Sequence, residues 1–352
     1  MRIVRFQPGQ PFERPVGAVL ARDVRVDGER WNKGRRLAAA DLDRLATLGP
    51  EGLPGGLLTL VVIEPGDLHE DDAALRLAAA VAGEGLTTHG PGESRVDLRA
   101  AWPGVVHVRT TQLERLNRID QLEVFTVFDG SIVKAGDLVA SAKVAPHVVP
   151  EVVVAGGERI AAGPGAARRP LVWVAPFKPL RVGAVVLESL HALARERFEA
   201  SVRAKVETLG STLVGIDYAD DEVSVIAALG RLTRGPGRVD VVLTAGGGST
   251  DPADPFYLAV AALGGRVVRQ GVPAHPGSML WLGRVGRTAI LGLPTCGAFS
   301  KATAADLVLP RLLTGEAPTP RLVSGIGHGG ILTRDHRFRF PAYARELDAP
   351  TG

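Results

Sequence analysis

The sequence predicts an α/β protein, in which a doubly wound, mostly parallel sheet occupies about residues 171–320 and smaller β-rich modules precede it. From Leu171 onward, apolar strand patterns alternate with helix patterns, which is typical of a parallel sheet with helical crossovers. Before that point, short strand patterns are separated by glycine turns. Residues 155–170 combine glycine, proline and charge without apolar periodicity, which indicates a linker. The expected divisions are a β/α module (1–60), a β-rich module (61–154), the linker (155–170), the α/β domain (171–320) and a C-terminal tail (321–352).

The first half contains several short strand patterns and few helices. Residues 57–63 predict a strand, and Glu70-Asp71-Asp72 then opens an Ala- and Leu-rich helix to about Ala82, with its acids at the positive end of the helix dipole. Further strands are expected at 105–108 and 124–128, before short strands around the turn signals Asp129-Gly130 and 135–137.

The second half has longer, alternating patterns. An apolar strand at 182–187 precedes an amphipathic helix at 191–209, whose apolar stripe includes Phe198 and Val202 while charged residues such as Lys205 face away. The later expected elements are a strand at 212–216, a helix from Asp220-Asp221 to 232, strands at 266–270, 279–282 and 289–293, and a last helix kinked or ended near Pro310.

One stretch, residues 239–263, carries the clearest functional pattern. A β-branched run breaks into Gly246-Gly247-Gly248-Ser249-Thr250, and a helix then starts with Asp254 as its N-cap and Pro255 at its first position. In a parallel sheet this turn lies at the carboxyl end of a strand, where glycine N–H groups and a helix N-terminus favour an anion. The pattern therefore indicates a phosphate-binding loop, and an ordinary strand-to-helix loop is the alternative.

Composition and missing motifs narrow the function. The chain contains no Gly-Lys pair, no G-x-G-x-x-G after the strand and no G-x-S-x-G, which argues against a Walker P-loop, a dinucleotide site and a serine-hydrolase elbow. Net charge is only +3 and aromatic residues are 5%, so small anions are better expected partners than nucleic acid. A single cysteine, no membrane-length apolar run and no signal-peptide pattern together predict a cytoplasmic protein with no membrane partner.

The residues of the second half resemble a known family. Thr244 to Ser249, the downstream Asp254, the segment His275-Pro276-Gly277 and the turn Gly292-Leu293-Pro294 are similar in order and spacing to the molybdopterin-binding domain. That domain is shared by molybdopterin molybdenumtransferases and molybdopterin adenylyltransferases. The resemblance covers about residues 180–315, and PVGAVLARDV near residue 15 resembles the N-terminal segment of the transferases. The motifs are specific for the fold, but proteins that share a fold need not catalyse the same reaction.

The resemblance implies molybdopterin or adenylylated molybdopterin as the ligand, with Mg²⁺ and molybdate as further components. Asp254, Glu188 and His275 are the implied catalytic residues, and Asp254 and Glu188 are also the implied metal ligands. The implied ligand-binding residues are Gly246, Gly247, Gly248, Ser249, Thr250, Asp251, Pro276, Gly277, Ser278, Pro294, Thr295, Cys296 and Ser300. Each has a plainer alternative, such as a helix cap for Asp254, a loop position for His275 and an inert core thiol for Cys296.

The chain departs from the family pattern in three places, so two main hypotheses stay open, with binding of another phosphorylated metabolite as a third. Residues 187–190 read Leu-Glu-Ser-Leu where the transferases have T-G-D-E, His275 and Ser278 replace the lysines of K-P-G-K, and residues 295–297 replace G-N-P. The first hypothesis is an enzyme that inserts molybdate into adenylylated molybdopterin and releases AMP. The second is a carrier that holds molybdopterin for a client molybdoenzyme without turnover. The resemblance also implies a homo-oligomer.

Overall fold

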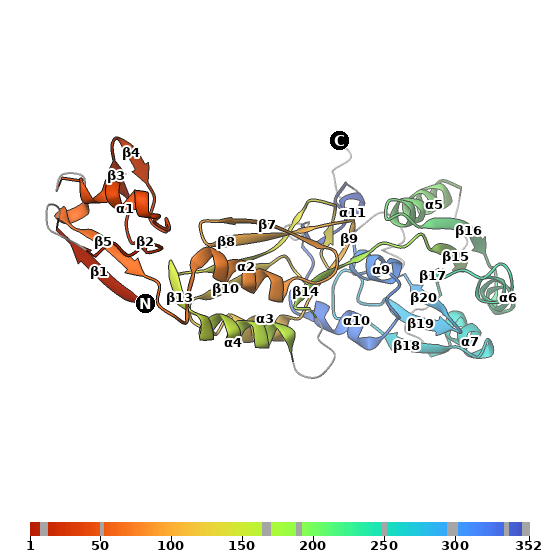
Figure 1. The fold of residues 1–352 in the computed structure, drawn as a ribbon. Coiled ribbons are helices and arrows are strands. Elements are labelled where there is room, and N and C mark those ends of the chain that lie inside the picture. Colours follow the sequence, from red (N-terminus) through yellow and green to blue (C-terminus); the bar gives the residue numbers. More distant parts are fainter. Residues whose placement is uncertain are drawn as a thin grey trace. The chain divides into compact units, whose positions relative to one another are not determined.

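The computed structural model describes residues 1–7, 13–49, 53–163, 170–187, 192–247, 252–293, 302–333 and 338–346. The chain forms two compact units (Figure 1). The first comprises Met1–Trp102, Val106–Asp129 and Ala135–Val174, and the second comprises Pro103–Val105, Gly130–Lys134 and Ala175–Gly352. The expected module 1–60 lies in the first unit, whereas the expected module 61–154 is divided between the two units.

The first unit combines antiparallel sheets with short helices. A three-stranded sheet, order β1-β5-β2, and the hairpin β3-β4 enclose a core that includes Leu20, Trp31 and Leu42. A four-stranded sheet, order β10-β12-β8-β7, follows. The elements of this unit are β1 (Arg2–Phe6), β2 (Val19–Leu20), β3 (Val24–Val26), β4 (Glu29–Trp31), α1 (Ala39–Ala46), η2 (Pro54–Gly56), β5 (Leu58–Val62), β6 (Asp67–His69), α2 (Glu70–Val81), β7 (Leu86–Gly92), β8 (Arg95–Ala100), α3 (Thr110–Leu116), β10 (Leu122–Thr126), β12 (Leu138–Val144), β13 (Val148–Pro150) and α4 (Glu151–Ala162).

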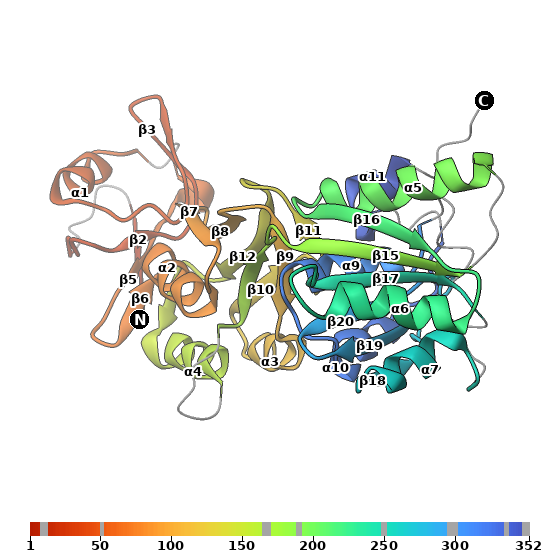
Figure 2. The ribbon, with the colours of Figure 1, turned by 90° about the vertical axis from the view of Figure 1, so that its right-hand side faces the viewer.

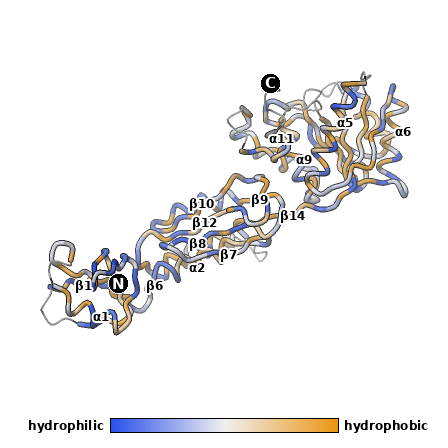
Figure 3. Tube along the Cα trace, turned by 90° about the horizontal axis from the view of Figure 1, so that it is seen from above, coloured by the Kyte–Doolittle hydropathy of each residue, from blue (hydrophilic) through white to orange (hydrophobic). Residues whose placement is uncertain are grey.

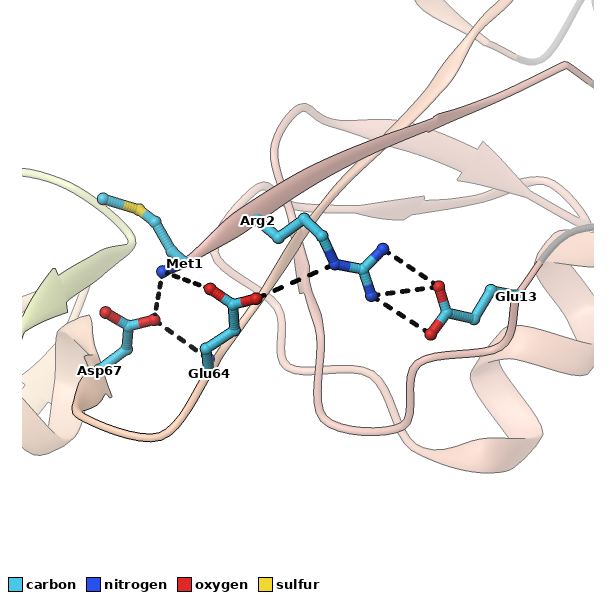
Figure 4. A network of polar contacts seen from close by, with 5 residues as sticks. All are labelled: Met1, Arg2, Glu13, Glu64 and Asp67. Atoms are coloured by element: carbon cyan, nitrogen blue, oxygen red, sulfur yellow. Dashed lines mark hydrogen bonds and ion pairs between the residues drawn. The ribbon is translucent and has the colours of Figure 1, made fainter.

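A polar network fastens the start of β1 (Figure 4). The Met1 ammonium lies 3.0 Å from Oε2 of Glu64 and 2.6 Å from Oδ2 of Asp67, while Arg2 donates to Glu13. Burial raises the pKa of the Asp67 carboxyl, but the Met1 ammonium and the Glu64 N–H outweigh it, so the pKa is lowered overall. Most of these groups are exposed, so water screens each pair and its contribution to stability is small.

The linker expected at 155–170 needs correction, because α4 (Glu151–Ala162) includes the first part of that segment. Val154, Gly157 and Ala161 are its buried residues, so one face of the helix does carry an apolar stripe. A Cβ at Gly157 would stand 2.7 Å from Cδ1 of Leu122, so a side chain here would require Leu122 to shift. The glycine hides the helical periodicity in the sequence, and the break between elements begins only after Ala162.

The second unit contains the expected mostly parallel sheet, with strand order β16-β15-β17-β20-β19-β18. Strands β16, β15, β17 and β20 are parallel, while β19 and β18 add antiparallel pairs at one edge. The elements are β11 (Ile132–Val133), β15 (Arg181–Leu187), α5 (Ala192–Glu207), β16 (Thr212–Tyr218), α6 (Glu222–Thr233), β17 (Val241–Gly246), α7 (Pro255–Ala262), β18 (Arg266–Gln270), β19 (Trp281–Val285), β20 (Thr288–Gly292), α9 (Ala305–Leu313), α10 (Pro320–Ser324), η3 (Gly325–Gly327) and α11 (Ala342–Glu346). Two strands, β9 (Gly104–Val108) and β14 (Val172–Pro176), contain the division between the units.

Helices cover both faces of this sheet, as a doubly wound fold requires (Figure 2). Alternate residues of β15 face opposite cores, because successive side chains of a strand point to opposite sides of the sheet. Val182 and Val186 pack with α5 and α9, whereas Val185 packs with α6 and α7. Along α5, hydrophobic and hydrophilic segments both appear (Figure 3), and Phe198 and Val202 lie in the core as expected.

The helix that contains Pro310, α9, ends at Leu313, near this proline as expected, but α10 and α11 follow it. The expected tail needs correction. The C-terminal segment is not a free tail, since Leu322, Phe340 and Tyr343 belong to the same buried cluster as α5 and α9.

Candidate functional site

The carboxyl ends of three parallel strands lie side by side at the same end of the sheet. Leu187 at the end of β15 is paired with Gly246 of β17, and Thr244 of β17 is paired with Gly292, the last residue of β20. Ligands of open parallel sheets bind outside this edge. The sequence therefore places its candidate loops where the fold favours a ligand.

Several predicted site residues follow these strand ends but lie outside the described residues. They belong to the segments 188–191, 248–251 and 294–301, and their roles stay predictions. They are Glu188, Gly248, Ser249, Thr250, Asp251, Pro294, Thr295, Cys296 and Ser300.

The described part of the glycine loop leaves β17 in a left-handed conformation. Gly246 has φ +86° and Gly247 has φ +71°, a region that residues with a side chain adopt only under strain. This conformation turns the chain sharply at the end of a buried strand, which explains why the sequence has glycines here.

Asp254 begins the next helix, as the sequence predicts. Its Oδ1 accepts a hydrogen bond from the N–H of Phe256 at 2.8 Å, and Pro255 is the first helical residue. The side chain is buried, with 2% of Asp254 exposed. A Cβ at Gly247 would lie 2.7 Å from Oδ2 of Asp254. The structure thus brings the glycine loop and the predicted aspartate into direct contact.

An aromatic pair joins α7, the helix that Asp254 begins, to β19. The rings of Tyr257 and Trp281 meet edge to face, with centroids 5.0 Å apart. Burial, and then the negative charge of Asp254, raises the pKa of the Tyr257 hydroxyl to about 12. The Trp281 indole covers Gly292, where a Cβ would collide with it. Sequence reasoning did not single out Tyr257 or Trp281, because each looks like an ordinary apolar position of its element.

The segment His275-Pro276-Gly277-Ser278 forms a loop held on two sides. On one side, the His275 N–H donates to the Gly330 carbonyl and the Leu332 N–H donates to the His275 carbonyl, both at 2.8 Å. On the other, the Pro276 carbonyl accepts from the Ala304 N–H at 3.0 Å. His275 itself is exposed, so its main chain is fixed while its side chain faces outward.

The described residues can be tested against the metal that the sequence implies. Among them, no group of three or more His, Cys, Asp or Glu side chains could hold a metal ion. Mg²⁺ in proteins commonly uses one or two carboxylates together with waters and substrate phosphates. The Asp254 carboxylate offers oxygens of the required hard type, so this residue fits such a partial site. None of the helices in the described ranges is long and apolar enough to cross a membrane.

The comparisons with known proteins point to the same part of the chain. A family model described as "Probable molybdopterin binding domain" matches residues 182–314. Residues 182–314 are therefore similar to this family. The match covers less than half of the chain and includes the glycine loop, Asp254 and the His275 loop.

Solved structures with similarity to this chain include proteins of molybdopterin biosynthesis. The molybdopterin biosynthesis enzyme MoaB from Thermus thermophilus is 24% identical over 40% of this chain and 99% of its own, with a TM-score of 0.28. A molybdenum cofactor biosynthesis protein B is 20% identical over 39% of this chain and 95% of its own, with a TM-score of 0.30. The molybdopterin biosynthesis MoeA protein from Pyrococcus horikoshii is 13% identical over 74% and 81%, with a TM-score of 0.28. A search of curated proteins finds no match.

Proposed function

We propose that the α/β domain binds molybdopterin or adenylylated molybdopterin at the carboxyl edge of its sheet. The observation that carries this proposal is the contact between Gly247 and the buried Asp254 carboxylate, directly after β17. Backbone N–H groups of a glycine turn and the start of α7 favour a phosphate group. A carboxylate beside a phosphate is repulsive unless a cation lies between them, which gives a physical reason for Mg²⁺ in the same site.

The proposed reaction takes up molybdate as a substrate and releases AMP from adenylylated molybdopterin. Asp254 holds Mg²⁺ in this proposal, with Glu188 as its second protein ligand, and the cation neutralises charge on the phosphate oxygens. His275 donates a hydrogen bond to molybdate or to the pterin, because its backbone is fixed and its side chain is exposed. The remaining predicted ligand residues contact the pterin and nucleotide portions.

The second candidate function is a carrier that binds the same ligand without turnover. It is favoured by the sequence Leu187-Glu188-Ser189-Leu190, which lacks the T-G-D-E of the transferases, and by His275 and Ser278 in place of lysines. The Asp254 carboxylate also already caps α7 through the Phe256 N–H, a role that needs no catalysis. Binding requires the loop and the helix start, whereas turnover also requires a group that activates the phosphoanhydride.

AMP release separates the two functions. Purified protein is incubated with adenylylated molybdopterin and Mg²⁺, with and without molybdate, and AMP is quantified against time. Release that depends on molybdate and falls in both Asp254→Asn and Glu188→Gln supports the transferase. Binding without release supports the carrier. If neither molybdopterin nor its adenylylated form binds, the proposed function is wrong.

We also propose that the chain forms a homo-oligomer in the cytoplasm and delivers its product or cargo to a molybdoenzyme. The support is the family resemblance, whose members combine residues of two chains at one site. Light scattering of the purified protein tests the oligomer, and a monomer at micromolar concentration would overturn it. Reconstitution of a cofactor-free molybdoenzyme tests delivery.

A further inference from the structure

A charged pair lies in the interior of the α/β domain, away from the contact of Gly247 with Asp254. Lys205 of α5 is 1% exposed and Asp306 of α9 is 0% exposed, and the Lys205 ammonium donates to Oδ1 of Asp306. Removing two charges from water is costly, so such a pair is not explained by stability alone. The sequence predicts that Lys205 faces solvent, and its burial is therefore a correction.

A third ionisable group, from the C-terminal segment, completes this cluster. Tyr343 of α11 lies with its ring centroid 5.4 Å from the Lys205 Nζ. Burial raises the pKa of the Tyr343 hydroxyl well above its usual value, and the negative charge of Asp306 raises it further. The negative charge of Asp306 is thus opposed by one cation and lies next to a neutral phenol.

The second oxygen of Asp306 fixes the start of α9. Oδ2 accepts a hydrogen bond from the N–H of Thr303 at 2.9 Å, and Oγ1 of Thr303 accepts from the N–H of Ala305 at 3.2 Å. The Ala305 N–H is one of the groups that a helix start leaves without an intrahelical partner, and the Thr303 N–H lies just before the helix. One carboxylate therefore joins α5 to the first turn of α9.

This first turn in turn supports the His275 loop. The Ala304 N–H donates to the Pro276 carbonyl at 3.0 Å. Gly277 has φ +107°, and a Cβ there would lie 2.8 Å from the Ala304 nitrogen. The loop therefore rests directly on the residues that Asp306 holds.

The C-terminal segment contacts the same assembly twice. Through residues 330–332 it pairs with the backbone of His275, and through Tyr343 it covers the Lys205–Asp306 pair. A segment that looks like a tail in the sequence thus borders both the loop and the charged pair that supports it.

We propose that Asp306, held by Lys205 and covered by Tyr343, is a positioning residue that fixes the Pro276–Gly277 loop for ligand binding. The role of the loop in binding rests on the proposed function, but its positioning does not. Hydrogen bonds link Lys205 to Asp306 and Asp306 to Thr303, and the adjoining Ala304 is bonded to Pro276. Loss of any of these hydrogen bonds allows the loop to adopt positions unsuited to the ligand.

The test begins with a measurement that needs no ligand. Hydrogen exchange is compared for the full-length wild type, Asp306→Ala and Tyr343→Ala, with Leu229→Ala as a control in the core on the opposite face of the sheet. We expect faster exchange at the amides of His275, Ala304 and Leu332 in both test variants, relative to amides of β17 in the same protein. Leu229→Ala is expected to lack this local excess. Uniform changes, or no change in Tyr343→Ala and in the double variant Lys205→Met/Asp306→Ala, would overturn the positioning role.

The second measurement is binding of anaerobically prepared molybdopterin to the same variants. We expect the dissociation constant of Asp306→Ala to rise roughly 3- to 30-fold, the range typical of residues that act through their neighbours, with no comparable rise for Leu229→Ala. Equal affinity in wild type and Asp306→Ala would overturn the link to binding. If the wild type does not bind molybdopterin, the proposed function fails, and the exchange data alone decide whether Asp306 positions the loop.

Discussion

The Asp254 carboxylate lies against the α-carbon of Gly247, so that a methyl group added there would stand 2.7 Å from Oδ2. This single contact joins the end of β17 to the start of α7. It also explains why the loop requires glycine at this position for two independent reasons, its positive φ and its lack of a side chain.

Gly247→Ala is expected to impair ligand binding, because the new methyl group must displace the carboxylate. Gly264→Ala is the matched control, since Gly264 has φ +70° and nothing lies within 4 Å of its added Cβ. Both variants should lose about 1–2 kcal/mol of unfolding free energy from the left-handed backbone. Only Gly247→Ala should weaken molybdopterin binding, as measured by titration. Equal binding by the two variants would contradict the role of this contact.

Asp254→Asn is expected to weaken binding of the ligand or of Mg²⁺ more than it lowers stability. Asparagine caps a helix about as well as aspartate, so the hydrogen bond from the Phe256 N–H can be kept. Asp221→Asn is the matched control, because Asp221 caps α6 by accepting from the Ser224 N–H at 2.8 Å. The melting temperature without ligand should change little in either variant. If Asp254→Asn lost as much unfolding free energy as binding free energy, the carboxylate would have a structural role alone.

Local sequence patterns predicted much of the α/β domain because its elements are regular. The alternation of apolar strands and amphipathic helices indicated the sheet class, and Asp254-Pro255 marked the start of α7 at the correct residue. These periodicity and capping patterns depend on residues within one element. They can therefore be recognised without knowledge of the tertiary contacts.

The features that sequence reasoning missed depend on contacts between distant elements. Lys205 lies beside the apolar stripe of α5, and its charge predicted exposure to solvent. The structure places Asp306, 101 residues later in the chain, next to it. Gly157 indicated a linker, although it allows Leu122 to approach α4. The support of Pro276 by Ala304 has no signal in either segment alone. The same reason applies to Tyr257 and Trp281, whose pairing at the sheet edge joins a helix to a strand.

Lys205→Met is expected to destabilise the domain strongly, because it leaves the Asp306 carboxylate buried without its cation. The expected loss in unfolding free energy is about 3–5 kcal/mol. Adding Asp306→Asn should recover part of this loss, since the amide is neutral and its oxygen can still accept from the Thr303 N–H. Arg203→Met on the same helix is the control. Its pair with Glu207 is exposed and is worth about 0.5 kcal/mol. Urea unfolding compares these three variants with the wild type, and a double variant less stable than Lys205→Met would contradict this account.

The three tyrosines give a pH-dependent test of burial in the α/β domain. Burial and then the hydrogen bond to Glu199 raise the pKa of Tyr218 to about 12, and burial with the Asp254 charge raises that of Tyr257 to about 12. Burial also raises the pKa of Tyr343. Because the folded state favours the protonated phenols, their contribution to stability is complete below pH 10, the usual tyrosine pKa, and is lost as the pH rises toward 12.

Tyrosinate absorbance measured against pH should therefore show no ionisation near pH 10 in the native protein, whereas the urea-unfolded protein should ionise all three residues there. Asp254→Asn provides a site-specific comparison. Removing its charge should lower the pKa of Tyr257 while leaving Tyr218 unchanged, since Tyr218 interacts with Glu199 and Arg195 instead. A native tyrosine that ionises near pH 10 would show that its side chain is solvated. If that residue were Tyr257, the enclosed arrangement of Asp254 and Tyr257 beside the glycine loop would be wrong.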